Sequence, residues 1–109
     1  MELTFATLDL EATAQSENRL RKIFGPSCDR ACQRLYELFA LDNLHLATLL
    51  PPLDLRSHSK SGQFSISVCP KHRITFELVP NAGLSVGVGA LDLASVTAIR
   101  ILALGGRHD

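Results

Sequence analysis

Residues Arg56–Glu77 read RSHSKSGQFSISVCPKHRITFE, and this stretch decides the fold. From Phe64 to Val68 apolar residues alternate with serines, and from Arg73 to Leu78 apolar residues alternate again with polar ones. Alternation with a period of two is typical of half-buried strands, and the short segment between the two runs fits a turn. The stretch therefore predicts a β-hairpin with one apolar face and one polar face.

The segment that leads into this hairpin carries the same alternation. Asp54, Arg56 and His58 share one parity, and the leucines before and between them take the other. An incoming strand with this pattern places His58 on the same polar face as Arg73. An imidazole and a guanidinium that converge on one surface suit the binding and cleavage of a phosphodiester.

Composition indicates one compact domain, residues 1–109. The chain has 109 residues, of which 46% are hydrophobic, and its formal net charge is zero, which neither requires nor forbids a nucleic-acid partner. No apolar run reaches the roughly 18 residues that span a bilayer, and the acidic start lacks the features of a signal peptide. Three cysteines, an odd number, argue against a secreted disulfide framework. We therefore expect a cytoplasmic protein with no membrane contact.

Helical signals dominate the N-terminal part of the chain. Residues 3–5 predict a short strand, and Thr7 and Ser16 are expected N-caps of two helical segments. Gly25 is expected to end the second segment, and Pro26 to begin the next helix. The predicted apolar stripe of that helix is Cys28, Ala31, Cys32, Leu35 and Phe39.

Strand signals dominate the C-terminal part. A short third helix, capped by Asp42 or Asn43 and ended by two prolines, leads into the hairpin. Residues 80–93 contain three glycines and predict a long loop. Residues 96–104, VTAIRILAL, predict a strand buried on both faces, expected to be the central one and to stop at Gly105 and Gly106.

This order of elements predicts an α+β fold. A short N-terminal strand and two to three helices would pack on one face of a mainly antiparallel four- to five-stranded sheet. The opposite face of the sheet would be left open for a ligand.

Several segments together resemble the RelE/ParE superfamily. They are the opening LTFATLDLE, the middle run ending in LPP, the segments GQFSI and HRITFE, and the late SVTAIRIL followed by a terminal histidine. More narrowly, the chain resembles the HigB type of plasmid-maintenance killer protein, and the likeness spans essentially the whole chain. It implies a RelE-like fold and a toxin of a type II toxin-antitoxin module that cuts mRNA on the translating ribosome and arrests growth.

The resemblance also implies partners and a chemistry without cofactors. The partners would be a helix-turn-helix, HigA-like antitoxin, which forms a small oligomer with the toxin, and the 70S ribosome with its mRNA. No metal or other cofactor is implied, because the family cuts RNA with side chains alone.

Two site residues follow from the resemblance and from their chemistry. His58 matches the family's histidine at the end of the second strand, and an imidazole can exchange protons with a ribose hydroxyl near neutral pH. Arg73 matches the family's arginine, whose guanidinium fits two phosphate oxygens and stabilises transition-state charge. The alternatives are a solvated surface histidine and an ordinary cross-strand ion pair of Arg73 with Glu77 or Asp54.

Four further residues complete the predicted site. His108 matches the last histidine of the family's Asp-Tyr-His ending and would be the second proton-transfer group if the tail folds back over the sheet. A disordered C-terminal histidine is the alternative. Arg107 stands where the family has tyrosine, and its guanidinium plane can stack on a base; Gly106 replaces the family's aspartate, so that carboxylate is absent. Lys60 and Arg56 are expected to contact RNA phosphates, and a merely solvated lysine is the alternative for Lys60.

Two other functions remain open on the sequence. The first is a catalytically inactive or weak member of the superfamily that binds a ribosome or an antitoxin without cutting. The second is a gyrase inhibitor like the ParE branch. Elsewhere, Cys28 and Cys32 are expected to pack in the core rather than bind metal, and Cys69 has no nucleophile context. His72 is expected either to point to the opposite face from Arg73 or to sit in the turn.

Overall fold

The computed structural model describes residues 1–58, 62–79 and 92–107, and within them five strands form one sheet in the order β1-β5-β4-β3-β2. The strands are β1 (Glu2–Phe5), β2 (Arg56–His58), β3 (Gln63–Cys69), β4 (His72–Leu78) and β5 (Ala98–Arg107). The predicted hairpin is confirmed as β3 and β4, and β2 is the incoming strand beside it. The overall α+β class is confirmed as well.

The sheet is mixed, which corrects the expected mainly antiparallel arrangement. β2, β3, β4 and β5 pair antiparallel, but β1 runs parallel to β5, with Leu3 opposite Ile99. A parallel pair needs a long crossover connection, and here all the helices and the other strands lie between the two partners in sequence. The first and last strands therefore meet at one side of the sheet.

Three α-helices lie within the described residues: α1 (Leu8–Ala14), α2 (Glu17–Phe24) and α3 (Cys28–Ala40). The side chains of Thr7 and Ser16 each accept a backbone N–H three residues further on, so both predicted N-caps are confirmed. Gly25, with φ of 56°, ends α2, and Pro26 lies in the 3₁₀ turn Gly25–Ser27 that leads into α3.

The predicted third helix consists of two 3₁₀ segments, Leu44–Leu49 and Pro51–Leu53. The side chain of Asn43 caps the first of them by accepting the N–H of Leu46. The second ends at Asp54, whose φ of 45° lies in the left-handed region. This turn directs the chain into β2.

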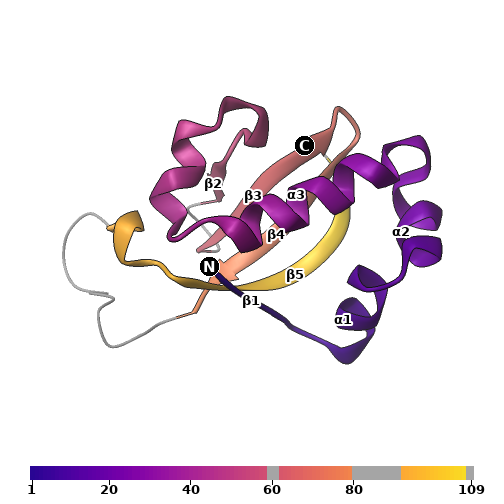
Figure 1. The fold of residues 1–109 in the computed structure, drawn as a ribbon, viewed down its shortest axis with the longest axis horizontal. Coiled ribbons are helices and arrows are strands. Elements are labelled where there is room, and N and C mark those ends of the chain that lie inside the picture. Colours follow the sequence, from indigo (N-terminus) through magenta and orange to yellow (C-terminus); the bar gives the residue numbers. More distant parts are fainter. Residues whose placement is uncertain (59–61, 80–91, 108–109) are drawn as a thin grey trace.

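The helices cover the apolar face of the sheet (Figure 1). In the figure α3 crosses the sheet, while α1 and α2 lie beside the bend of β5. Leu20, Phe24 and Leu38 from the helices belong to the same buried cluster as Ile66 and Phe76 from the sheet. Burial of such side chains contributes about 1.5–3 kcal/mol each, so this cluster is the main source of stability.

The apolar stripe of α3 differs from the one predicted. Cys28 and Ala31 are buried, but Cys32 is exposed and Phe39 is 61% exposed. Arg34 is buried instead: its Nε donates to the carbonyl of Ser67 at 3.1 Å and its Nη1 to Glu37 at 2.7 Å. The buried face of α3 therefore includes a charged residue, which can be buried because the sheet and the helix both supply hydrogen-bond acceptors for its guanidinium group.

The long apolar strand also differs from the prediction. β5 lies between β1 and β4, so β4 is the central strand of the five. Ile99 and Ile101 are buried, but Arg100 between them is exposed, so β5 is not buried on both faces.

The glycines of β5 do not end it. Arg73 pairs with Gly106 and Ile74 with Leu104, which leaves Gly105, with φ of 85°, as an extra residue in the strand. This β-bulge bends β5, and the strand continues to Arg107.

Most of the predicted loop at 80–93 lies outside the described residues. Across the described part of the chain, no helix combines the length and the apolar character needed to cross a bilayer.

Candidate functional site

His58 and Arg73 lie on the same face of the sheet and are joined through Ser65. His58 Nε2 lies 2.9 Å from Ser65 Oγ, and Arg73 Nε donates to the same oxygen at 2.8 Å. Because β3 lies between β2 and β4, its Ser65 side chain can meet one neighbour from each side. The parity in the sequence thus placed the two predicted side chains correctly.

Arg73 is held by several hydrogen bonds and is only 3% exposed. Its Nη1 donates to Asp54 Oδ2 at 2.9 Å, and its Nη2 donates to the backbone carbonyls of Asp54 and of Ser65. The ion pair left open by the sequence is therefore the one with Asp54, since Glu77 pairs with Arg100 at 2.7 Å. As a result, Arg73 ties the start of β2 to β3 and β4.

Asp54 is the acceptor on which two guanidinium groups meet. Its Oδ2 lies 2.9 Å from Arg73 Nη1 and 3.1 Å from Arg56 Nη2. The pKa of the Asp54 carboxyl lies below its ordinary value, chiefly because of the hydrogen bond from Arg73. Burial of the carboxyl opposes this shift, and the charge of Arg56 adds to it. The carboxylate is therefore charged throughout the neutral range.

The cluster has an exposed layer and a buried layer. Arg56 and His58 are exposed, and the Asp54 side chain is 45% exposed, whereas Ser65 and Arg73 are buried beneath them. Two guanidinium groups against one carboxylate leave an excess of positive charge beside the imidazole. Such a surface attracts phosphate groups, and its imidazole can transfer protons.

The structure does not describe the side chains of the remaining predicted site residues. Lys60 and His108 lie outside the described residues. The backbone of Arg107 ends β5 opposite His72, and its side chain also lies outside what the structure describes. Their predicted roles stay predictions.

The central positions of Ser65 and Asp54 were missed from the sequence. Alternation placed Ser65 on the polar face, but nothing in the sequence marks a serine in this run as buried. The sequence contained one signal for Asp54: it is acidic and shares the parity of Arg56 and His58, which are expected on the same face as Arg73. This signal identified Asp54 only as one of two possible partners of Arg73. The left-handed turn at Asp54 aims both of its acceptor groups at Arg73.

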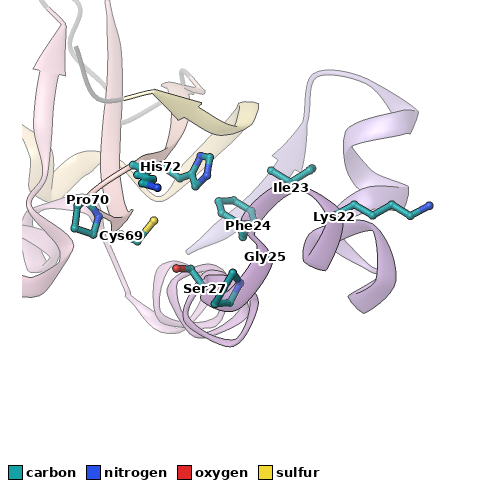
Figure 2. Close-up of a pocket in the computed structure, with 10 residues that line it drawn as sticks. Lys22, Ile23, Phe24, Gly25, Ser27, Cys69, Pro70 and His72 are labelled. Carbon is teal, nitrogen blue, oxygen red and sulfur yellow. The ribbon is translucent and has the colours of Figure 1, made fainter.

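A second region with polar groups lies at the turn of the hairpin, around Cys69 (Figure 2). A hollow of about 490 Å³ is lined by residues 22–27 and 69–72, and a neighbouring hollow of about 410 Å³ shares Ser27, Cys69 and the two prolines beside them. The ring of His72 packs edge-on against Phe24 at 5.6 Å, and its Nδ1 lies 3.1 Å from the carbonyl of Gly105. His72 thus faces away from Arg73, as predicted.

The surroundings of Cys69 change its acidity. Burial raises the pKa of the Cys69 thiol, but hydrogen bonds from the Ser27 hydroxyl and from the backbone of Lys71 and His72, with the charge of Arg30, outweigh that effect and lower it. The pKa of the Cys32 thiol is raised instead, first by burial of its sulfur and then by the neighbouring Cys28, although the residue as a whole is exposed. The two thiols should therefore differ in reactivity.

We expect iodoacetamide to alkylate Cys69 several-fold faster than Cys32 in the folded protein at neutral pH, because the thiolate is the reacting form. Mass spectrometry of peptides after brief labelling measures both rates in one sample. The same protein unfolded in urea is the control, in which the two rates should become similar. Faster labelling of Cys32 in the folded protein would contradict the lowered pKa of Cys69 and the raised pKa of Cys32.

The described residues contain no group of three or more His, Cys, Asp or Glu side chains placed to hold a metal ion. Comparisons of the chain with protein-family models, with curated proteins and with solved structures give no match. The functional argument therefore rests on the geometry of the cluster formed by Asp54, Arg56, His58, Ser65 and Arg73, which we call the polar cluster.

Proposed function

We propose that this protein is a toxin of the RelE/ParE superfamily, HigB type, that cuts mRNA on the translating ribosome in the cytoplasm. The observation that carries the proposal is the connection of His58 to Arg73 through Ser65, with both contacts within 2.9 Å. A proton-transfer group and a phosphate-binding group are therefore close enough to act on one phosphodiester. The resemblance of the whole chain to the superfamily supports the same conclusion.

The proposed reaction is transfer of a phosphoryl group within the RNA. The ribose 2′-oxygen forms a bond to the adjacent phosphorus as the bond from phosphorus to the 5′-oxygen of the next nucleotide breaks. His58 takes the proton of the 2′-hydroxyl, and His108, by the resemblance, gives a proton to the leaving 5′-oxygen. Arg73 stabilises the charge on the phosphoryl oxygens, and the products are a cyclic phosphate and a 5′-hydroxyl end.

Binding of the RNA backbone is proposed to depend on the exposed bases around this cluster. Arg56 is half exposed at the edge strand β2, where its guanidinium can contact a phosphate. The resemblance adds Lys60 and Arg107 to this set, and a helix-turn-helix antitoxin as the partner that inhibits the toxin. Contacts of this kind weaken as salt concentration rises, because binding releases condensed counterions.

A second candidate function is a superfamily member that binds without cutting. It is favoured by the burial of Arg73 and by its hydrogen bonds to Asp54 and Ser65, which occupy three of its nitrogen atoms. In this case the polar cluster would be a structural tie, and the protein would block a ribosome by occupying it.

Replacement of His58 by alanine is expected to abolish most of the growth arrest caused by induction of the protein. Loss of a general acid or base typically lowers a rate about a hundredfold or more, whereas the fold should survive because His58 is exposed. Growth curves and incorporation of a labelled amino acid after induction measure the effect.

The matched control is His45→Ala, which removes an exposed histidine from the 3₁₀ segment Leu44–Leu49. This variant should arrest growth as the wild type does. Undiminished arrest by His58→Ala would remove the imidazole from the mechanism. DNA damage in place of translation arrest would identify the gyrase-directed alternative.

A further inference from the structure

Two guanidinium groups from different strands converge on a single carboxylate oxygen. Arg56 comes from the edge strand β2 and Arg73 from β4, two strands away, and both contact Asp54 Oδ2, at 3.1 Å and 2.9 Å. Guanidinium groups bind carboxylates and phosphates with the same donor geometry. The position of Oδ2 is therefore also a position in which a phosphate oxygen would be bound.

The carboxylate occupies the exposed side of this position. The side chains of Asp54 and Arg56 are 45% and 50% exposed, while that of Arg73 is 4% exposed. An anion bound in place of the carboxylate would contact both Arg73 Nη1 and Arg56 Nη2. The internal anion and an external one therefore compete for the same donors.

Loss of the carboxylate would leave Arg73 in place. Its Nε still donates to Ser65 Oγ, and its Nη2 still donates to the backbone carbonyls of Asp54 and Ser65. The backbone of Asp54 is held separately by its N–H, which donates to the carbonyl of Pro51 at 3.0 Å. Rotation of one half-exposed side chain is thus enough to free Nη1 without moving a strand.

We propose that the Asp54 carboxylate is an internal substitute for the RNA phosphate, which it excludes from Arg56 and Arg73 until the phosphate displaces it. The inference rests on the proposed function and deepens it by naming the group that closes the site. Each anion carries a single negative charge, so the two guanidinium groups face one negative charge both before and after the exchange. The buried Arg73 then corresponds to the closed state of a binding site, in which the Asp54 carboxylate occupies its Nη1 donor.

The test compares RNA binding by Asp54→Asn with that of the wild type. Asparagine keeps an oxygen acceptor for Arg73 and tolerates the left-handed φ of 45° at this position, so the fold should be retained. The probe is a short fluorescein-labelled oligouridine without ribosomes, and anisotropy gives its dissociation constant at low and at physiological salt. We expect about tenfold tighter binding by Asp54→Asn, which corresponds to about 1.4 kcal/mol.

The matched control is Glu77→Gln, which changes the net charge equally on a strand of the same sheet. Glu77 is also partly exposed and pairs with an arginine, Arg100, at 2.7 Å. We expect it to tighten binding by less than about twofold, since a general charge effect is screened by salt. Equal tightening by the two variants, or no tightening by Asp54→Asn, would overturn the inference.

A measurement on the wild type keeps the test independent of variant folding. On titration with the oligouridine, the NMR signal of the Arg73 Nε–H should shift, because the anion bound to its guanidinium changes. An unshifted signal at saturating RNA would overturn the inference. Tighter RNA binding by Asp54→Asn without mRNA cleavage by the wild type would retain the anion site and reject the nuclease; cleavage without tighter binding would do the reverse.

Discussion

Arg73→Ala is expected to lower the free energy of unfolding by about 3 kcal/mol, because it removes a buried guanidinium that satisfies acceptors on two other segments. Its side chain is 4% exposed and donates to Asp54 Oδ2, to Ser65 Oγ and to two backbone carbonyls. After the substitution these acceptors near the start of β2 lose their donor. Urea denaturation followed by circular dichroism measures the loss.

Arg100→Ala is the control for this prediction. It breaks an ion pair with Glu77 of similar length, 2.7 Å, but here both side chains are partly exposed, at 45% and 36%, whereas that of Arg73 is 4% exposed. Exposed pairs contribute about 0.2–1 kcal/mol, so a much smaller loss is expected. Similar losses in the two variants would show that Arg73 is not the tie described above.

The stability that Arg73 gives through Asp54 should depend on pH. The pKa of the Asp54 carboxyl is lowered in the folded protein, chiefly by the hydrogen bond from Arg73. A lowered folded-state pKa stabilises the protein fully above the unfolded-state pKa, and this contribution is lost as the pH falls through the lowered value. The loss caused by Arg73→Ala should therefore be smaller in acid than at neutral pH.

Gly105→Ala is expected to destabilise the protein by about 3 kcal/mol, from backbone strain and overpacking together. Gly105 has φ of 85°, and a Cβ atom there would overlap the Cγ2 methyl of Ile23. The bulge of β5 thus leaves no room for a side chain against α2. Thermal and urea unfolding of the variant measure the effect.

Gly62→Ala separates the two causes. Gly62 has a comparable φ of 69°, but a Cβ atom there would have no atom of the described residues within 4 Å, so only the strain of about 1 kcal/mol is expected. Ile23→Ala added to Gly105→Ala removes the overlapping methyl and should cost less than the sum of the two single changes. Equal losses in Gly105→Ala and Gly62→Ala would contradict the packing described for the bulge.

Local signals in the sequence were enough for the hairpin and for the helix caps. The side chains of Thr7, Ser16 and Asn43 cap their helices through contacts only three residues away, so short patterns predict them. The burial of Arg34 and the parallel pairing of β1 with β5 depend on residues distant in sequence, which no local pattern contains. Those two features are accordingly among the ones that the sequence did not predict.

The candidate site was predictable to the same extent. Parity placed His58 and Arg73 on one face, because alternation along strands is a local property. The buried bridge at Ser65 and the capture of Arg73 by Asp54 depend on strand order and on a left-handed turn. These features decide whether Arg73 is open to a phosphate, so the chemistry was less predictable than the placement.

The most direct test of the proposed function is the mapping of mRNA 5′ ends in a reconstituted translation reaction. With the wild-type protein we predict new ends inside the translated region, each with a 5′-hydroxyl, and about a hundredfold fewer of them with His58→Ala. The same set of ends with and without the wild-type protein would contradict the proposal.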